Sequence, residues 1–216
     1  YNGVAVIPES PVGKIQLDFD NNVNDKYGNS TWTNNGVTFD QVNSVKGYSS
    51  KYENGSFISS NNTNDLNFGT ANFSLSFDTK KNTLNSTCYL FSNNIIHNDV
   101  SNKAIWFYKG SFANNFSYID YKDKPINTTS HINTDFPNVW YSEIVGRKSS
   151  VLYQVKNDVI VLAHNLSNQV FEIKYGDSFL LGKAQWANGA DGSFNGYIDN
   201  FKSIKNPQEQ VVIDKP

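Results

Sequence analysis

Short runs of aromatic and β-branched residues recur along most of the chain, and Asn, Gly, Asp and Ser separate them. Within many runs apolar and polar residues alternate, which indicates strands that bury one face. In residues 14–20, for example, the alternation places Ile15, Leu17 and Phe19 on one side. No helical pattern extends beyond about two turns, so the chain is predicted to be all-β.

The predicted strands are 14–20, 36–40, 56–59, 73–80, 87–93, 104–109, 117–121, 140–147, 150–156, 159–164, 179–184 and 197–204. They are too many for a seven-stranded immunoglobulin sandwich and favour a larger jelly roll. Residues 1–13 are predicted to be a linker or edge segment, 14–205 a single domain, and 206–216 an exit segment. Because the chain holds no Met and begins at Tyr1, we expect it to be a piece of a longer protein.

Six motifs in sequence order resemble the laminin-G-like, concanavalin A-like jelly-roll superfamily. They lie at 18–28, 36–58, 72–77, 140–145, 152–158 and 181–199, and the likeness spans roughly residues 14 to 205. The resemblance implies an antiparallel two-sheet jelly-roll sandwich. It leaves function open, because the superfamily includes lectins, carbohydrate-binding modules, glucanases, adhesion domains and phage tail modules. Asp158 stands where the family often has a turn glycine, which leaves the type of that turn open.

The last predicted strand contains an acidic residue, which is unusual because Asp is depleted from strands and costly to bury unpaired. Strict alternation puts Asp199 on the same side as Tyr197, Phe201 and Ser203. In the superfamily the first and last strands are often neighbours, and a structural calcium lies near equivalent acids. The resemblance therefore implies possible Ca²⁺ ligands in Asp20 and Asp199. The alternative is that both carboxylates cap turns and accept backbone N–H bonds.

Composition excludes several classes of function. Only 18% of residues are charged, the net charge is -2 and no block of like charge occurs, which argues against nucleic acid as a partner. No apolar run approaches ~18 residues, so membrane insertion is not expected. Cys88 is the only cysteine and is expected to be a small core residue. The lack of an internal disulfide favours a bacterial, phage or viral origin.

The sequence offers no catalytic pattern. Retaining glucanases of this fold place two carboxylates on one face of a strand, whereas Glu143 has no acidic partner on its own strand. His97, His131 and His164 are scattered without metal-ligand spacing. We therefore expect a protein that is not an enzyme, and a degenerate glycosidase would need carboxylates from different strands.

Sugar sites combine aromatic planes with amides and carboxylates, and two regions fit this description. On 104–109, Trp106 and Tyr108 are expected to face away from the core, with Tyr118 (or Tyr121) on the next strand extending the surface; alternatively, loops cover them. The second region is a Gly-rich loop. Its expected binding residues are Trp186, Gln185, Asn188 and Asp191; alternatively, Trp186 folds back as a plug.

The other tryptophans and the single arginine receive different interpretations. The resemblance places Trp140 in the core, while Trp32, in an Asn- and Thr-rich segment, is ambiguous. Arg147 could bind a charged sugar or phosphate but is expected to be an ordinary surface residue.

Together these patterns favour a non-catalytic carbohydrate-binding module. It would recognise a cell-surface polysaccharide as part of a phage tail, receptor-binding protein or bacterial adhesin, outside the cell or on a virion. The alternative is a structural or protein-binding jelly-roll module of a surface protein with no sugar site.

Overall fold

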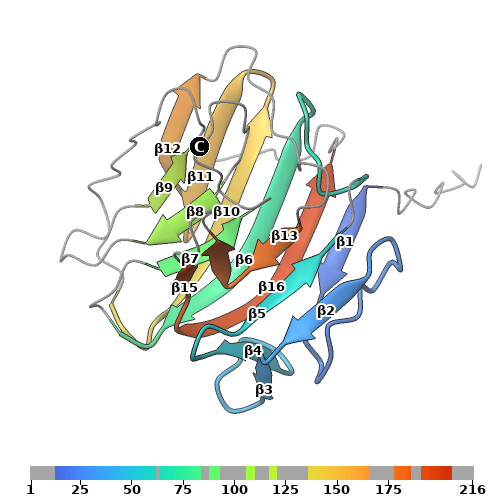
Figure 1. The fold of residues 1–216 in the computed structure, drawn as a ribbon. Coiled ribbons are helices and arrows are strands. Elements are labelled where there is room, and N and C mark those ends of the chain that lie inside the picture. The colour runs from blue at the N-terminus through green and yellow to red at the C-terminus, as the bar shows by residue number, and fades with distance from the viewer. Residues whose placement is uncertain are drawn as a thin grey trace, which may run out of the picture.

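The structure is a computed structural model that describes residues 13–61, 64–83, 88–92, 106–109, 117–120, 136–165, 178–185 and 191–205. All strands in these ranges pair antiparallel, and two large sheets pack face to face, as Figure 1 shows. The described residues contain no helix. The predicted all-β, two-sheet antiparallel sandwich is therefore confirmed.

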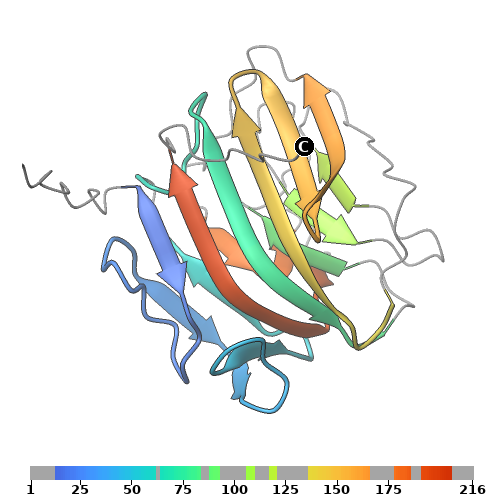
Figure 2. The same cartoon turned by 180° about the vertical axis from the view of Figure 1, so that it is seen from behind.

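The larger sheet has eight strands. Its main path is β12 (Val159–Asn165), β11 (Val151–Lys156), β10 (Trp140–Lys148), β6 (Phe73–Lys81), β16 (Gly196–Lys205), β4 (Ser49–Tyr52) and β3 (Thr38–Asp40). The eighth strand, β1 (Lys14–Leu17), also pairs with β16. Figure 2 shows the outer face of this sheet, where the long central strands bend along their length.

The second sheet has six strands. Its order is β2 (Trp32–Asn35), β5 (Phe57–Ser60), β13 (Phe179–Leu181), β7 (Cys88–Ser92), β8 (Trp106–Lys109) and β9 (Ser117–Asp120). A separate hairpin, β14 (Lys183–Gln185) and β15 (Asp191–Ser193), packs against β7. The single strand predicted at 179–184 is thus two strands. Gly182, with φ +82°, separates them, and a methyl group there would overlap the Tyr52 ring.

The core between the sheets is rich in phenylalanine. The rings of Phe91 and Phe179 stack with their centroids 5.8 Å apart, and Phe77 of the other sheet meets Phe91 edge-on at 6.1 Å. Cys88 is fully buried among them, as predicted. Trp32 is also a core residue. It lies on β2, meets Phe179 edge-on, and donates its indole N–H to Ser30 Oγ at 2.7 Å.

The alternation predicted for β16 is wrong in its second half because the strand contains a β-bulge. Asp199 pairs with Asp78 and Lys202 with Ser76, so two residues of β16 oppose one residue of β6. Asn200 occupies the bulge with φ +51°. The bulge reverses the facing of the residues that follow. Asp199 therefore lies on the outer face of the sheet, while Phe201 belongs to the core.

The interpretations of Trp140 and Arg147 are also wrong. Trp140 is half-buried on the outer face of the sheet, opposite Lys80 in the register, with its ring centroid 6.4 Å from that of Tyr197. Arg147 is buried, and its Nε donates to the Ser149 carbonyl at 2.8 Å. Alternation along β10 explains both positions, because it directs Trp140 to the outer face and the odd-numbered residues, including Arg147, to the inner face.

The β11–β12 connection resolves the question raised by Asp158. Asn157 and Asp158 have φ of 46° and 65°, the two positive values that a type I′ hairpin turn requires. Asn157 also accepts a bond from Ser142 N at 3.0 Å through its side chain, which ties the turn to β10.

Candidate functional site

The first predicted binding region lies on β8 and β9 of the six-stranded sheet. Phe107 is buried in the core, which agrees with the alternation expected on residues 104–109. The strand register places Tyr108 directly between Tyr89 of β7 and Tyr118 of β9, in one row across three strands. Trp106 precedes Tyr108 by two residues on β8. The side chains of Trp106, Tyr108 and Tyr118, and all of Tyr121, lie outside the described part of the structure.

The second predicted region belongs to the β14–β15 hairpin. Gln185 and Asp191 are opposite each other at the end of this two-stranded ladder, with only their backbones described. The segment that joins them contains Trp186 and Asn188 and lies outside the described residues. The structure therefore pairs two of the four predicted loop residues and leaves the other two untested.

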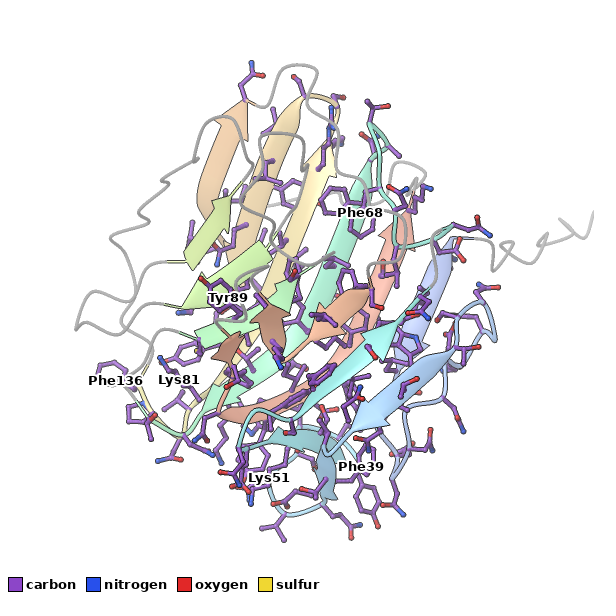
Figure 3. All side chains as sticks on the ribbon, viewed as in Figure 1. Phe39, Lys51, Phe68, Lys81, Tyr89 and Phe136 are labelled. Carbon is purple, nitrogen blue, oxygen red and sulfur yellow. The ribbon has the colours of Figure 1, made fainter. Side chains whose placement is uncertain are left out.

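The two regions meet at Tyr89, which is labelled in Figure 3. This half-buried side chain starts the tyrosine row, and its ring lies so close to Gly192 of β15 that a methyl group there would overlap it. The hairpin consequently packs beside the tyrosine row. The sequence alone could not show that the two regions are adjacent, because no pattern in it pairs β7 with β15.

Asp199, one of the two predicted calcium ligands, is completely buried beneath the loop of residues 41–48 that joins β3 to β4. Its Oδ2 accepts bonds from Val45 N at 2.8 Å and Lys46 N at 3.1 Å, and its Oδ1 accepts one from Asn200 N at 2.7 Å. Burial raises the pKa of the Asp199 carboxyl, and the charge of Asp78 adds to that effect. Asp199 thus anchors the 41–48 loop to the sheet.

Asp20, the other predicted calcium ligand, is exposed and lies against Gly47 of the same loop. The structure therefore brings both acids to one loop. Backbone N–H groups nevertheless occupy both oxygens of Asp199, which is the alternative role weighed from the sequence. In the described ranges, no three His, Cys, Asp or Glu side chains gather as metal ligands. Calcium binding stays a prediction.

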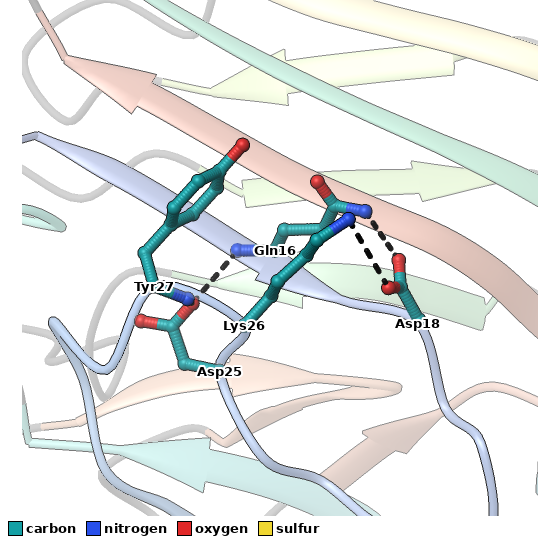
Figure 4. A network of polar contacts seen from close by, with 5 residues as sticks. All are labelled: Gln16, Asp18, Asp25, Lys26 and Tyr27. Carbon is teal, nitrogen blue, oxygen red and sulfur yellow. Dashed lines mark hydrogen bonds and ion pairs between the residues drawn. The ribbon is translucent and has the colours of Figure 1, made fainter. Parts of the chain in front are cut away.

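A pocket of about 630 Å³ opens on the outer face of the eight-stranded sheet. One wall is the connection between β1 and β2, which Asp25 organises by accepting Gln16 N at 3.0 Å and Tyr27 N at 3.1 Å. In the same wall Gln16 Nε2 donates to Asp18, and Lys26 Nζ lies 4.0 Å from that carboxylate (Figure 4). The 41–48 loop forms the opposite wall.

The floor of this pocket comes from β6, β10 and β16. It presents Ser76, Asp78, Ser142 and Asn200, and Asn200 Nδ2 donates to Asp78 Oδ2 at 2.8 Å. The lysine and aspartate side chains of the lining are equal in number: Asp18, Asp20, Asp78, Lys26, Lys46 and Lys202. No sequence pattern points to this pocket, because its floor depends on the bulge in β16.

Carboxylates from different strands, which a glycosidase would need, do occur side by side. Asp78 and Asp199 are direct register partners on the outer face, so their side chains are neighbours. Asp199, however, has no exposed surface from which to reach a substrate. Glu143 is equally buried on the inner face, where Gln154 Nε2 donates to its Oε2 at 3.1 Å.

No protein-family model matches the chain, and no curated protein matches its sequence. Solved structures do resemble it. Domain 4 of AbnA, an extracellular GH43 arabinanase from Geobacillus stearothermophilus solved with arabinotriose, superposes with a TM-score of 0.68 at 18% identity, over 88% of this chain and 91% of that domain. A Trypanosoma rangeli sialidase mutant gives 0.60 at 11% identity, over 90% of this chain and 31% of the other.

The botulinum neurotoxin serotype G binding domain gives a TM-score of 0.57 at 16% identity. This chain spans about half of it, since 90% of this chain covers 48% of that domain. Likenesses at such identities establish the β-sandwich fold. The described residues also contain no helix of the length and apolarity that would be needed to cross a membrane.

Proposed function

We propose that this chain is a non-catalytic carbohydrate-binding module that recognises a cell-surface polysaccharide outside the cell. The observation that carries the proposal is that the hairpin of the second predicted region packs against the sheet that carries the first. The register aligns Tyr89, Tyr108 and Tyr118, and the β14–β15 hairpin packs beside Tyr89. A row of aromatic residues bordered by amides and a carboxylate suits sugar rings, whose apolar faces stack while their hydroxyls bond.

Each residue type has a specific part in this mechanism. Since Phe107 enters the core, alternation along β8 assigns Trp106 and Tyr108 to the outer face of the six-stranded sheet. There they and Tyr118 would stack against sugar rings. Gln185 and Asp191, at the base of the hairpin, would bond to hydroxyls. Trp186 and Asn188, which follow Gln185 in the sequence, would add a stacking ring and an amide.

The fold neighbours support a sugar ligand without identifying it. The neighbour with the highest TM-score among those above was solved with arabinotriose and covers almost the same length as this chain. We propose that the domain belongs to a phage tail or receptor-binding protein or a bacterial adhesin. In such proteins many copies act together, so that weak single sites give firm attachment.

A fluorescent fusion of the domain, applied to a glycan array and to bacterial cell walls, tests the proposal. Selective, saturable labelling is expected, and Trp186→Ala and Tyr108→Ala should abolish it while the circular dichroism spectrum stays unchanged. Val159→Ala, at an exposed position of β12, is the matched control and should label normally. Loss of labelling in EDTA would support the predicted calcium. A folded domain that labels no surface would instead favour a structural module.

A hydrolase is the second candidate, because Asp78 and Asp199 are register partners and Asp199 has a raised pKa. The burial of Asp199 beneath the 41–48 loop opposes it. Chromatography of the array glycans after incubation with the domain separates the two functions, since a binding module leaves every glycan intact.

A further inference from the structure

The outer face of the eight-stranded sheet lies on the opposite side of the sandwich from the tyrosine row (Figures 1 and 2). The pocket of about 630 Å³ on this face is large enough for part of an oligosaccharide. Hydrogen bonds to buried or partly buried carboxylates also hold both walls of this pocket in place. Asp25 fixes one wall through backbone bonds, and Asp199 fixes the other through Val45 and Lys46.

The charges in the pocket favour a neutral ligand rich in hydroxyl groups. Asp18 has partners in Gln16 and Lys26, whereas Lys46 and Lys202 have no carboxylate partner among the described residues. Because the lysines and aspartates balance, the lining would not hold a strongly charged ligand. A hydroxyl group can donate to a carboxylate and accept from an ammonium or amide at the same time. The mixture of groups therefore matches sugar hydroxyls.

An aromatic surface adjoins the polar floor. Trp140 precedes Ser142 by two residues on β10, so both lie on the outer face, and Ser142 lines the pocket. The Trp140 ring is half-buried and tilts against Tyr197, whose other neighbour is Lys80 Nζ at 5.4 Å from the ring centroid. A ring stacked on Trp140 would thus continue into a polar pocket.

The β-bulge supplies the last element. Asn200 adopts φ +51°, and its amide donates to Asp78 Oδ2, leaving the amide oxygen of Asn200 to accept from a ligand. Bulges often re-aim a side chain beside a functional site. Without the bulge, strict alternation would direct Asn200 to the inner face, away from Asp78.

From these contacts we infer a second carbohydrate site, for a neutral oligosaccharide, formed by Trp140, Ser142, Asn200, Asp78 and the facing loops. It does not depend on the tyrosine row, because the two sites lie on opposite sheets. A domain with both sites would bridge two glycan chains.

Nuclear magnetic resonance of the ¹⁵N-labelled chain tests this inference. The neutral probes are arabinotriose, maltotriose, cellotriose and chitotriose, and the acidic probe is trigalacturonic acid. At least one neutral trisaccharide should shift the amide signals of Gly47, Ser76 and Asn200 and the indole signal of Trp140. Trp140→Ala should weaken this binding by about tenfold, the effect expected for one aromatic contact. Asn200→Gly, which keeps the positive φ, should weaken it as well.

Two variants separate this site from the proposed one. Tyr108→Ala should leave the shifts at Gly47 and Asn200 intact even where it removes binding at the tyrosine row, and Val159→Ala should alter neither. The inference is overturned if no neutral probe shifts these signals, if trigalacturonic acid alone does so, or if Trp140→Ala binds as wild type. Shifts confined to β7–β9 would support the proposed function and refute the second site.

Discussion

Replacing Asp199 with Asn tests how a buried carboxylate holds a surface loop. The carboxylate accepts three backbone N–H groups at 2.7–3.1 Å. An Asn side chain can keep the two bonds from Val45 and Lys46 through its oxygen, but its NH₂ group then faces Asn200 N–H. One bond to a charged acceptor is lost, which costs about 1.5–3 kcal/mol, and relief of the burial penalty on the charge offsets part of this. We expect a net cost of about 2 kcal/mol for Asp199→Asn and more for Asp199→Ala, which removes both acceptor oxygens and with them all three bonds.

The pH dependence follows from the raised pKa of Asp199. An acid whose pKa is higher in the folded than in the unfolded chain stabilises the fold fully below its unfolded pKa of 3.8, and this contribution is lost as pH rises through the folded pKa. Asn does not titrate, so the pH-dependent contribution of Asp199 is absent from the variant. The destabilisation caused by Asp199→Asn should therefore be larger at pH 4 than at pH 7.

Urea unfolding followed by tryptophan fluorescence at both pH values measures these differences. Amide exchange at Val45 and Lys46 should accelerate in the variant, which localises the effect to the 41–48 loop. A cost that grows with rising pH would refute the reasoning, because it would mean that the three N–H bonds outweigh burial. A variant as stable as wild type at both pH values would show that the carboxylate does not anchor the loop.

Four substitutions test the packing. Gly192→Ala forces a methyl group into the Tyr89 ring, so it should destabilise by about 1–3 kcal/mol and weaken labelling of glycans, as measured by urea unfolding and the fluorescent fusion. Trp32→Ala should cost about 3–5 kcal/mol, whereas Trp140→Ala should cost about 1 kcal/mol or less; the reverse order of urea midpoints would contradict their assigned positions. Asn157→Ala removes the bond from Ser142 N and places Ala at a positive φ, so it should destabilise the fold by about 1–2 kcal/mol. A thermal midpoint equal to that of wild type would contradict this expectation.

The sequence predicted most strands because the apolar alternation is strong where a strand covers the core. In the predicted strand 14–20 the inward residues Ile15, Leu17 and Phe19 are all buried. Strands β2, β4 and β15 were missed, since Trp32–Asn35, Ser49–Tyr52 and Asp191–Ser193 are mostly polar and owe their conformation to neighbouring strands. Tertiary pairing, which single-sequence patterns do not contain, determined them.

The same limit explains the errors at individual residues. Alternation is reliable only while the ladder is regular, and the bulge at Asn200 reverses it within β16. Trp140 was assigned to the core by resemblance, although the register of β10 directs it outward. The predicted binding regions were recognisable from residue type, but their adjacency required the contact between Tyr89 and Gly192. The outer pocket had no sequence signal at all, because five separate segments form it.

Pairing of β1 with β16 has a mechanical consequence. Lys14 lies opposite Ile204, and Lys205 N donates to the Gly13 carbonyl at 2.8 Å, so residues 13 and 205 lie at the same end of one antiparallel ladder. A tensile force applied through these two residues would break the hydrogen bonds of that ladder one pair at a time, starting at the end where residues 13 and 205 lie. Force would therefore peel β1 away before it stretched the central strands that carry the outer pocket.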